Sequence, residues 1–253
     1  MTYYKSNALY DKIKEMGLTN FKFVSGDAWQ LVYGNDACNP LLLVFAKGTT
    51  FTEYNQELSE QDIDAINLLS HVSDRTGLQL IIIKFQTDMS IIQEVLFAYS
   101  DLKFQKISLS GLSALYGKYG LPVSNTSTDK YLNDKTSSAY HNWQRQSLGR
   151  SLTVSDIDLW RIDETATPEI IFELKRSYYS LERWKPFIDD YNNFRLISNL
   201  CNMASLNFKI AYNVRTKYPF YDDISKIKLF EVDFNKQPPI KEEGIISLKE
   251  FLY

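Results

Sequence analysis

Two strand-like segments in the C-terminal half of the chain decide its fold: Ser155-Asp-Ile-Asp-Leu-Trp160 and Ile171-Phe-Glu-Leu-Lys-Arg176. The first belongs to a predicted strand over Ser151–Ile162 that has one polar face, and the second to a strongly apolar strand over Glu169–Lys175. The short stretch between them, Asp163–Pro168, suits the loop of a β-hairpin. We therefore expect the two strands to be neighbours in one sheet.

Side-chain alternation brings charged groups of these strands together. Strand residues two positions apart point to the same face of a sheet, so Glu173 and Lys175 share one face. By the same rule, Asp156 and Asp158 share a face. If the two segments pair, two carboxylates and an amine converge near one end of the hairpin.

The surrounding sequence predicts an α/β unit with a mixed sheet. A helix is expected over Ala139–Leu148, before the first strand, and a longer one from about Asp189 to Ser205, with one apolar face. Further strands are expected over Phe208–Val214 and Lys226–Val232. The resulting order of helix, strand, strand, helix and strand predicts a mixed sheet flanked by helices.

The N-terminal half predicts a second α/β unit. A buried strand is expected over Pro40–Lys47, a helix with a capping box from Ser59 to about Thr76, and another strand over Leu78–Phe85. A helix is also expected over Ile91–Ser100. The polar residues 123–138 give the best boundary, which predicts an N-terminal recognition or interaction domain over 1–122 and a second domain over 139–253.

The N-terminal half also repeats the C-terminal pattern faintly. Pro40–Lys47 parallels Pro168–Lys175, because seven positions separate the proline from the lysine in both segments. In this alignment Trp29 stands where Asp158 would be, and Phe45 stands where Glu173 would be. The N-terminal domain is therefore either a degenerate copy of the C-terminal fold or an unrelated α/β domain.

Composition excludes several classes of site. Two cysteines and two histidines leave few ligands for a zinc site and few candidates for a histidine-centred triad. The strongest apolar runs, Leu41–Ala46 and Leu80–Ile83, are too short to span a bilayer, and the N-terminus does not resemble a signal peptide. We expect a cytoplasmic protein with no membrane partner. The net charge of −3 disfavours broad nonspecific nucleic-acid binding.

The converging carboxylates predict a site for Mg²⁺ or Mn²⁺. Hard divalent cations prefer carboxylate oxygens and water, which Asp158 and Glu173 would supply. The backbone carbonyl of Leu174 would be a further ligand. A bound metal would polarise a phosphate and lower the pKa of a bound water, and Lys175 would orient or deprotonate that water.

These residues resemble a known family. The pattern SDIDLW…IIFELKRS is similar to the core of the PD-(D/E)XK nucleases, which include restriction endonucleases and Holliday-junction resolvases. The resemblance covers about seventy residues and implies a restriction-endonuclease-like fold for the C-terminal domain. It implies that Asp158, Glu173 and Lys175 are catalytic, with Asp156 as an auxiliary carboxylate. Ser155 replaces the proline of the family pattern.

The resemblance also implies further roles. Many members place a Glu or Gln on the helix before the first strand, and that role falls here on Gln146 or Gln144. The resemblance implies an Mg²⁺-dependent DNA endonuclease, in restriction or phage defence first and in recombination or repair second. Candidate contacts to nucleic acid are Arg145, Arg150, Arg176, Tyr178, Arg183 and Lys185.

Two other interpretations remain open. The chain would be a catalytically silent interaction module that keeps the fold, which the acidic net charge favours. Alternatively, it would be one subunit of a larger nucleic-acid-processing complex whose basic surface lies on a partner protein. Many members of the resembled family work as dimers, so a homodimer is a further expectation.

Overall fold

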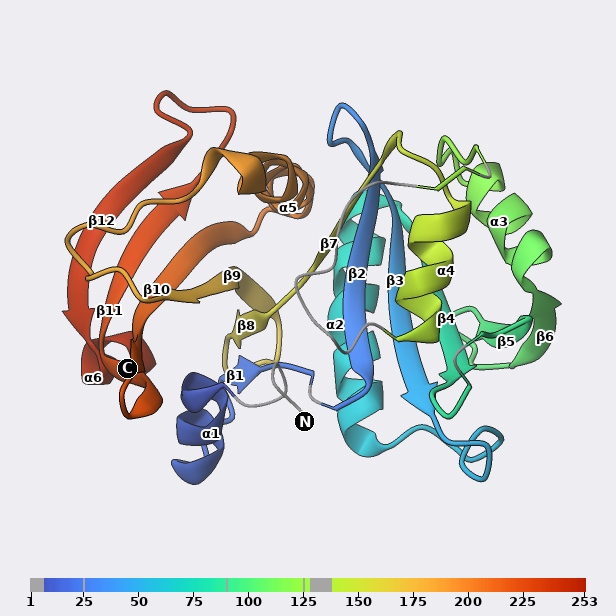
Figure 1. The fold of residues 1–253 in the computed structure, drawn as a ribbon, viewed down its shortest axis with the longest axis horizontal. Coiled ribbons are helices and arrows are strands. Elements are labelled where there is room, and N and C mark those ends of the chain that lie inside the picture. The colour runs from blue at the N-terminus through green and yellow to red at the C-terminus, as the bar shows by residue number, and fades with distance from the viewer. Residues whose placement is uncertain (1–6, 25, 90, 125, 128–137) are drawn as a thin grey trace. The chain divides into compact units, whose positions relative to one another are not determined.

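A computed structural model describes residues 7–24, 26–89, 91–124, 126–127 and 138–253 (Figure 1). The chain forms two compact units. The first contains Val24–Asp156, and the second combines residues 7–23 with Ile157–Tyr253. In the described residues the chain therefore passes between the units twice, once after Phe23 and once after Asp156.

The sheet of the first unit is mixed and six-stranded in the described residues, in the order β7-β2-β3-β4-β5-β6. The pair β3/β4 is parallel and every other neighbouring pair is antiparallel. Its strands are β2 (Ala28–Asn35), β3 (Pro40–Thr49), β4 (Gln79–Gln86), β5 (Glu94–Ala98), β6 (Gln105–Ser108) and β7 (Leu152–Asp156).

Helices cover both faces of this sheet. Helix α2 (Glu60–Thr76) provides the crossover that the parallel pair β3/β4 requires, and Ser59 and Asp62 form the predicted capping box at its start. Helices α3 (Leu109–Lys118) and α4 (Ala139–Ser147) join the apolar core on the other face. Burial of this apolar core between the sheet and the two helices stabilises the sheet.

The sheet of the second unit has the same pattern of pairing. Its order is β1-β8-β9-β10-β11-β12, with β9/β10 parallel and the other pairs antiparallel. Its strands are β1 (Phe21–Lys22), β8 (Leu159–Ile162), β9 (Pro168–Ser177), β10 (Asn207–Lys217), β11 (Phe220–Val232) and β12 (Ile240–Ser247).

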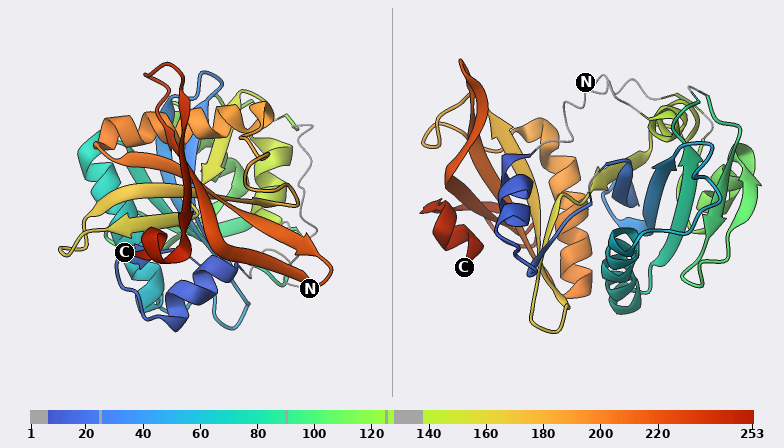
Figure 2. Two further views of the ribbon diagram at one scale, coloured as in Figure 1. Left: turned by 90° about the vertical axis from the view of Figure 1, so that its left-hand side faces the viewer. Right: turned by 90° about the horizontal axis from the view of Figure 1, so that it is seen from below.

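Three helices complete the described part of the second unit. Helix α5 (Tyr191–Ala204), preceded by the 3-10 turn Ile188–Asp190, connects the parallel strands β9 and β10. Helices α1 (Ala8–Glu15) and α6 (Leu248–Leu252) share an apolar core with the opposite face of the sheet. Figure 2 shows α5 on one side of this sheet and α1 on the other.

The predicted class of mixed α/β sheets flanked by helices is confirmed in both halves. None of the helices in the described part of the chain has the length and apolar character that a bilayer crossing requires. The predicted helix over Ile91–Ser100 is wrong, because Glu94–Ala98 forms a strand paired on both edges. Pairing with β4 overrides the local helical pattern there.

The division into units also differs from the boundary expected at residues 123–138. Helix α4 and strand β7 follow that segment but pack with the first unit, and α1 and β1 pack with the second. The strand expected over Ser151–Ile162 is likewise two strands, β7 and β8, in two different sheets. Alternation along the sequence could not reveal the break, because both pieces are extended and half-buried.

A chain of tyrosine hydroxyls lies in the core of the first unit. Tyr33 Oη donates to Gln144 Oε1 at 2.6 Å, so its own oxygen accepts from Tyr140 at 2.8 Å. The Tyr140 oxygen then accepts from Tyr116 at 2.7 Å, because each hydroxyl has one proton to give. Burial raises the pKa of Tyr140 to about 12, which keeps the chain protonated near neutral pH.

We expect Tyr140→Phe to lower the free energy of unfolding by about 1–2 kcal/mol, because it leaves the buried Tyr116 donor without its acceptor. Tyr116→Phe is the matched control, since it removes only the outer end of the chain and should cost less. Urea denaturation of both variants measures the difference. A larger loss for Tyr116→Phe would contradict the proposed direction of the hydrogen bonds.

Candidate functional site

The pair Glu173 and Lys175 lies near the end of β9, on one face of the sheet as the sequence predicts. Lys175 Nζ contacts Glu173 Oε1 at 2.9 Å. The side chain of Glu173 is 12% exposed and that of Lys175 27% exposed, so this ion pair is mostly withdrawn from solvent. The alternation of β9 thus produces a close charged pair rather than two solvated side chains.

A third carboxylate, which the sequence analysis missed, also contacts this lysine. Asp190 ends the 3-10 turn that leads into α5, and its Oδ2 lies 3.4 Å from Lys175 Nζ. The ring of Phe194, one turn into α5, has its centroid 5.4 Å from the same nitrogen. The signal available in the sequence was the position of Asp190 at the start of the expected helix, where acidic residues are common.

Asp158 is held beside this pair by the backbone of β9. It lies immediately before β8, and its Oδ2 accepts a hydrogen bond of 2.7 Å from the backbone nitrogen of Leu174, between Glu173 and Lys175. Its carbonyl oxygen accepts a 2.7 Å hydrogen bond from Tyr10 Oη of α1. Both ends of Asp158 are therefore fixed, and the structure brings the three predicted catalytic residues together.

The electrostatics of this cluster stabilise the charged form of the lysine. Burial by itself lowers the pKa of Lys175, but the carboxylates of Glu173, Asp190 and Asp158 outweigh it and hold that pKa above its usual value. The lysine is therefore an ammonium at neutral pH. In this arrangement it can offset negative charge and donate hydrogen bonds.

The donor set suits a hard divalent cation in type. Asp158 and Glu173 offer carboxylate oxygens, and Mg²⁺ is commonly held by one or two carboxylates with water completing its shell. In the described part of the chain, no three Asp, Glu, His or Cys side chains gather in an arrangement that would hold a metal by themselves. A metal here would therefore depend on Asp158, Glu173 and water, with the Leu174 carbonyl as a predicted further ligand.

The predicted auxiliary residues lie elsewhere in the fold. Asp156 ends β7 in the first unit, where it pairs with Leu31, so it is not on a shared strand face with Asp158. Gln144 and Gln146 lie on α4, which also belongs to the first unit. The helix that precedes the first strand of the second sheet is α1 instead. These three residues belong to the first unit because the chain changes sheets between β7 and β8.

The predicted phosphate-binding arginines are also divided. Arg145 and Arg150 belong to the first unit, where Arg150 Nε donates to the carbonyl of Ser127 at 3.3 Å. Arg176 Nη1 contacts Asp222 Oδ2 at 2.7 Å, and Arg215 Nε contacts the other oxygen of Asp222 at 2.8 Å. Arg176 is therefore part of a mostly buried ion triad rather than an exposed phosphate contact.

Three predicted nucleic-acid contacts are exposed near the end of β9. Tyr178, Arg183 and Lys185 lie between β9 and the turn that starts α5, and all are solvent-exposed. Lys217 Nζ lies 4.7 Å from the centroid of the Tyr178 ring. Trp184 in the same segment is buried. The segment that follows β9 therefore exposes an aromatic ring and two cationic side chains to solvent.

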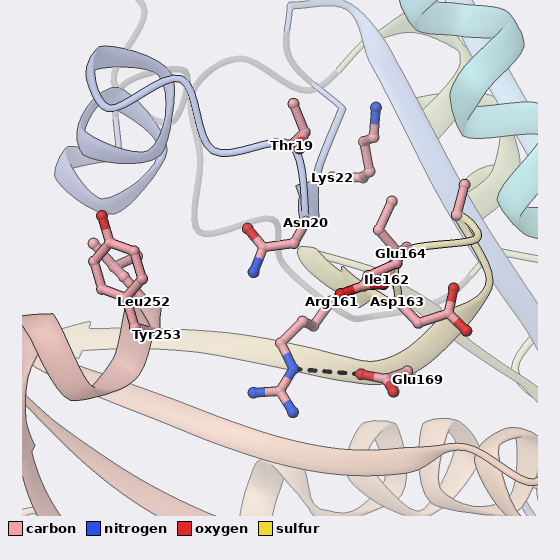
Figure 3. A pocket seen from close by; sticks show the side chains of 11 residues that line it. Thr19, Asn20, Lys22, Arg161, Ile162, Asp163, Glu164, Glu169, Leu252 and Tyr253 are labelled. Carbon is pink, nitrogen blue, oxygen red and sulfur yellow. Dashed lines mark ion pairs between the residues drawn. The ribbon is translucent and has the colours of Figure 1, made fainter.

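A separate hollow lies at the other end of the β8–β9 hairpin. It has a volume of about 600 Å³ and is shown in Figure 3, where Arg161 and Glu169 form an ion pair of 3.7 Å. Its charged lining mixes both signs, with Lys22 and Arg161 against Asp163, Glu164 and Glu169. The hollow is not at the carboxylate cluster, and its lining does not converge on one ligand chemistry.

Comparisons with known proteins do not assign the chain. No protein-family model and no curated protein matches it. A solved structure titled as the C-terminal domain of the sex pheromone staph-cAM373 precursor from Staphylococcus aureus aligns with 85% of this chain and 69% of its own. Its sequence identity is 7% and its TM-score is 0.17, so it carries no argument about fold or function.

We expect Asp222→Ala to lower the free energy of unfolding by about 3 kcal/mol, because it leaves the mostly buried Arg176 and Arg215 without their shared counter-ion. Glu164→Ala removes the same charge from an exposed loop and should change stability little. Guanidinium denaturation measures both. A loss below about 1 kcal/mol for Asp222→Ala would mean that the arginines turn to solvent.

Proposed function

We propose that the second unit is a metal-dependent nuclease of the PD-(D/E)XK type. The observation that carries the proposal is the convergence of Asp158 with Glu173 and Lys175. Asp158 is hydrogen-bonded to the backbone nitrogen between these two residues, and Lys175 contacts Glu173. A carboxylate before one strand and an ExK pair on the next are the residues on which the resemblance to that family rests.

Each residue has a separate role in this proposal. Asp158 and Glu173 would hold Mg²⁺ or Mn²⁺, which supplies Lewis acidity toward a phosphate and toward a bound water. Lys175, which is charged at neutral pH, would orient the water and offset negative charge that develops on the phosphate. Asp190 would keep the amine in place when Glu173 turns to a cation.

The surrounding fold supports the same proposal. In the second sheet a helix precedes the first strand, two antiparallel strand pairs precede the crossover helix, and the crossover helix leads into a parallel strand. This is a mixed sheet flanked by helices, as the resemblance implies. The finer assignment of a restriction-endonuclease-like fold is part of the proposal.

The proposed substrate is nucleic acid, with DNA first. Tyr178 offers an exposed ring for stacking, and Arg183 and Lys185 offer cations for phosphates in the same segment. Because the net charge of the chain is −3, a surface that binds nucleic acid would be a local basic patch. Restriction or phage defence is the proposed context, with recombination or repair as the alternative, and both depend on the family analogy alone.

A second candidate function is that of a catalytically silent interaction module or a subunit of a larger complex. The observation in its favour is that Lys175 contacts both Glu173 and Asp190 within the chain. Each of these carboxylates is stabilised by contact with the ammonium, which does not require a metal. Metal binding therefore separates the two candidates.

We expect the purified chain to cut DNA only with Mg²⁺ or Mn²⁺, and Asp158→Ala and Lys175→Ala to lower the rate at least about 100-fold. Plasmid, linear and single-stranded DNA and RNA are assayed with an EDTA control. Calorimetry with Mn²⁺ measures metal binding independently of cleavage.

The matched control for this assay is Lys106→Ala. Lys106 contacts Glu94 at 2.8 Å in the first unit, so the variant breaks an exposed lysine–carboxylate pair that is not part of the proposed site. Cleavage should survive in this variant. Activity that persists in Asp158→Ala would overturn the proposal, and the absence of both cleavage and Mn²⁺ binding would favour the interaction module.

A further inference from the structure

The two halves of the chain repeat one order of elements. Helix, three strands, helix, three strands and helix follow one another from α1 to α3, and the same order runs from α4 to α6 in the described residues. The last helix begins directly after the last strand in both halves, at a capping serine, Ser108 or Ser247. A tandem repeat explains this order without any permutation of the chain.

Strand register repeats with a constant spacing of 128 residues. Leu31 pairs with Val44 across β2/β3, and Leu159 pairs with Phe172 across β8/β9. Residue 159 corresponds to 31 and 172 to 44. Across the parallel pairs, residue 45 faces 82 and residue 173 faces 210, which again differ by 128. A chance likeness between two α/β units would not preserve register over three strands.

Side-chain contacts repeat with the same spacing. Lys47 contacts Asp62 at 2.9 Å, and Lys175 contacts Asp190 at 3.4 Å, with both partners 128 positions further along. The crossover helices end with a left-handed residue at equivalent positions, Gly77 and Ser205. The contact between a strand lysine and the start of the crossover helix is therefore common to both halves.

A buried lysine bonds to an equivalent carbonyl in each unit. Lys84 Nζ donates to the carbonyl of Gln56 at 2.6 Å, and Lys228 Nζ donates to that of Trp184 at 3.2 Å. Positions 56 and 184 again differ by 128. The position equivalent to Lys84 is Tyr212 of β10, and Lys228 lies opposite Tyr212 on the neighbouring strand β11. The lysine therefore occupies different strands in the two units, whereas the carbonyl that it contacts is at an equivalent position in both.

The first strand of each repeat pairs with the other repeat. Strand β1 precedes β2 in the chain but pairs with β8, and β7 precedes β8 but pairs with β2. We infer that the chain is a tandem duplication whose two copies have exchanged their first helix and first strand, so that the first copy completes the candidate site of the second unit.

The register also identifies what the first copy has lost. Gln30, and not Trp29, stands at the position equivalent to Asp158, and its Nε2 donates to the carbonyl of Ala65 at 2.8 Å. Phe45 stands at the position of Glu173, as the sequence alignment indicates. The first unit therefore keeps the lysine–aspartate contact without the two carboxylates proposed to bind metal.

The exchange ties the candidate site to the N-terminal repeat. Tyr10 belongs to the first repeat, yet its hydroxyl donates to the carbonyl of Asp158, and β1 borders β8. We assign Tyr10 as a positioning residue for Asp158. This assignment rests on the proposed function, whereas the exchange itself does not.

A disulfide test distinguishes the exchanged from the unexchanged pairing. Asn35 and Leu152 are partners across β2/β7, so Asn35→Cys with Leu152→Cys, in a Cys38→Ser background, should form a disulfide on oxidation. In an unexchanged chain Leu152 would lie beside β8, where position 163 is equivalent to 35. The matched pair is therefore Asp163→Cys with Leu152→Cys, which should not link.

The link is detected after a protease site inserted behind the exposed Ser127 is cut in the folded, oxidised protein. With Asn35→Cys and Leu152→Cys, the two fragments should stay joined on a non-reducing gel and separate on reduction. Separation without reduction would overturn the exchange. Positions 152 and 163 lie in the same fragment, so that pair is followed by thiol labelling, and loss of both free thiols on oxidation would also overturn the exchange.

For the site, Tyr10→Phe should weaken Mn²⁺ binding about tenfold in calorimetry, because the ring is kept and the hydrogen bond to Asp158 is lost. Tyr253→Phe, at an exposed residue, is the control. Unchanged Mn²⁺ affinity in Tyr10→Phe would remove the positioning role. If the unmodified chain binds no Mn²⁺, the proposed function and this role both fail, while the disulfide test still decides the exchange.

Discussion

A lysine ammonium held between a strand and the start of the following helix is the contact on which both units depend. Lys47 contacts Asp62, and Lys175 contacts Asp190. A half-buried ammonium needs an anionic partner, because burial removes it from water. The crossover helix must therefore begin close to the end of the strand that precedes it. That constraint sets the start of the connection that a parallel strand pair requires.

The candidate site follows largely from local alternation, and so it could be predicted in part. Glu173 and Lys175 are two positions apart on a strand, which fixes their common face whatever the partners of that strand are. Asp190 could not be predicted to join them. It lies fifteen positions beyond Lys175 by numbering, and only the closure of the helix onto the sheet brings the two together. Contacts that depend on tertiary packing leave little trace in a local pattern.

The domain boundary could not be predicted for a related reason. Alternation reports which face a residue occupies but does not report the neighbouring strand. Leu152–Asp156 and Leu159–Ile162 both have extended, half-buried patterns, and they join different sheets. A polar segment such as residues 123–138 normally marks a boundary because few contacts cross it. Here the helix and strand that follow it return to the preceding unit, so Asp156 and Gln146 belong to the first unit.

Comparison of the two repeats indicates which residues would distinguish a nuclease from a binding module. The lysine–aspartate contact is present in the first unit without Asp158 or Glu173, so it is not by itself evidence for catalysis. At the equivalent positions the first unit has Gln30 and Phe45 in place of these two carboxylates. Carboxylates withdrawn from water need compensation, which Glu173 receives from Lys175 and Asp158 from the backbone nitrogen of Leu174. Since the chain compensates both without a metal, their presence is consistent with stability alone, and function depends on whether a divalent cation competes with Lys175 for Glu173.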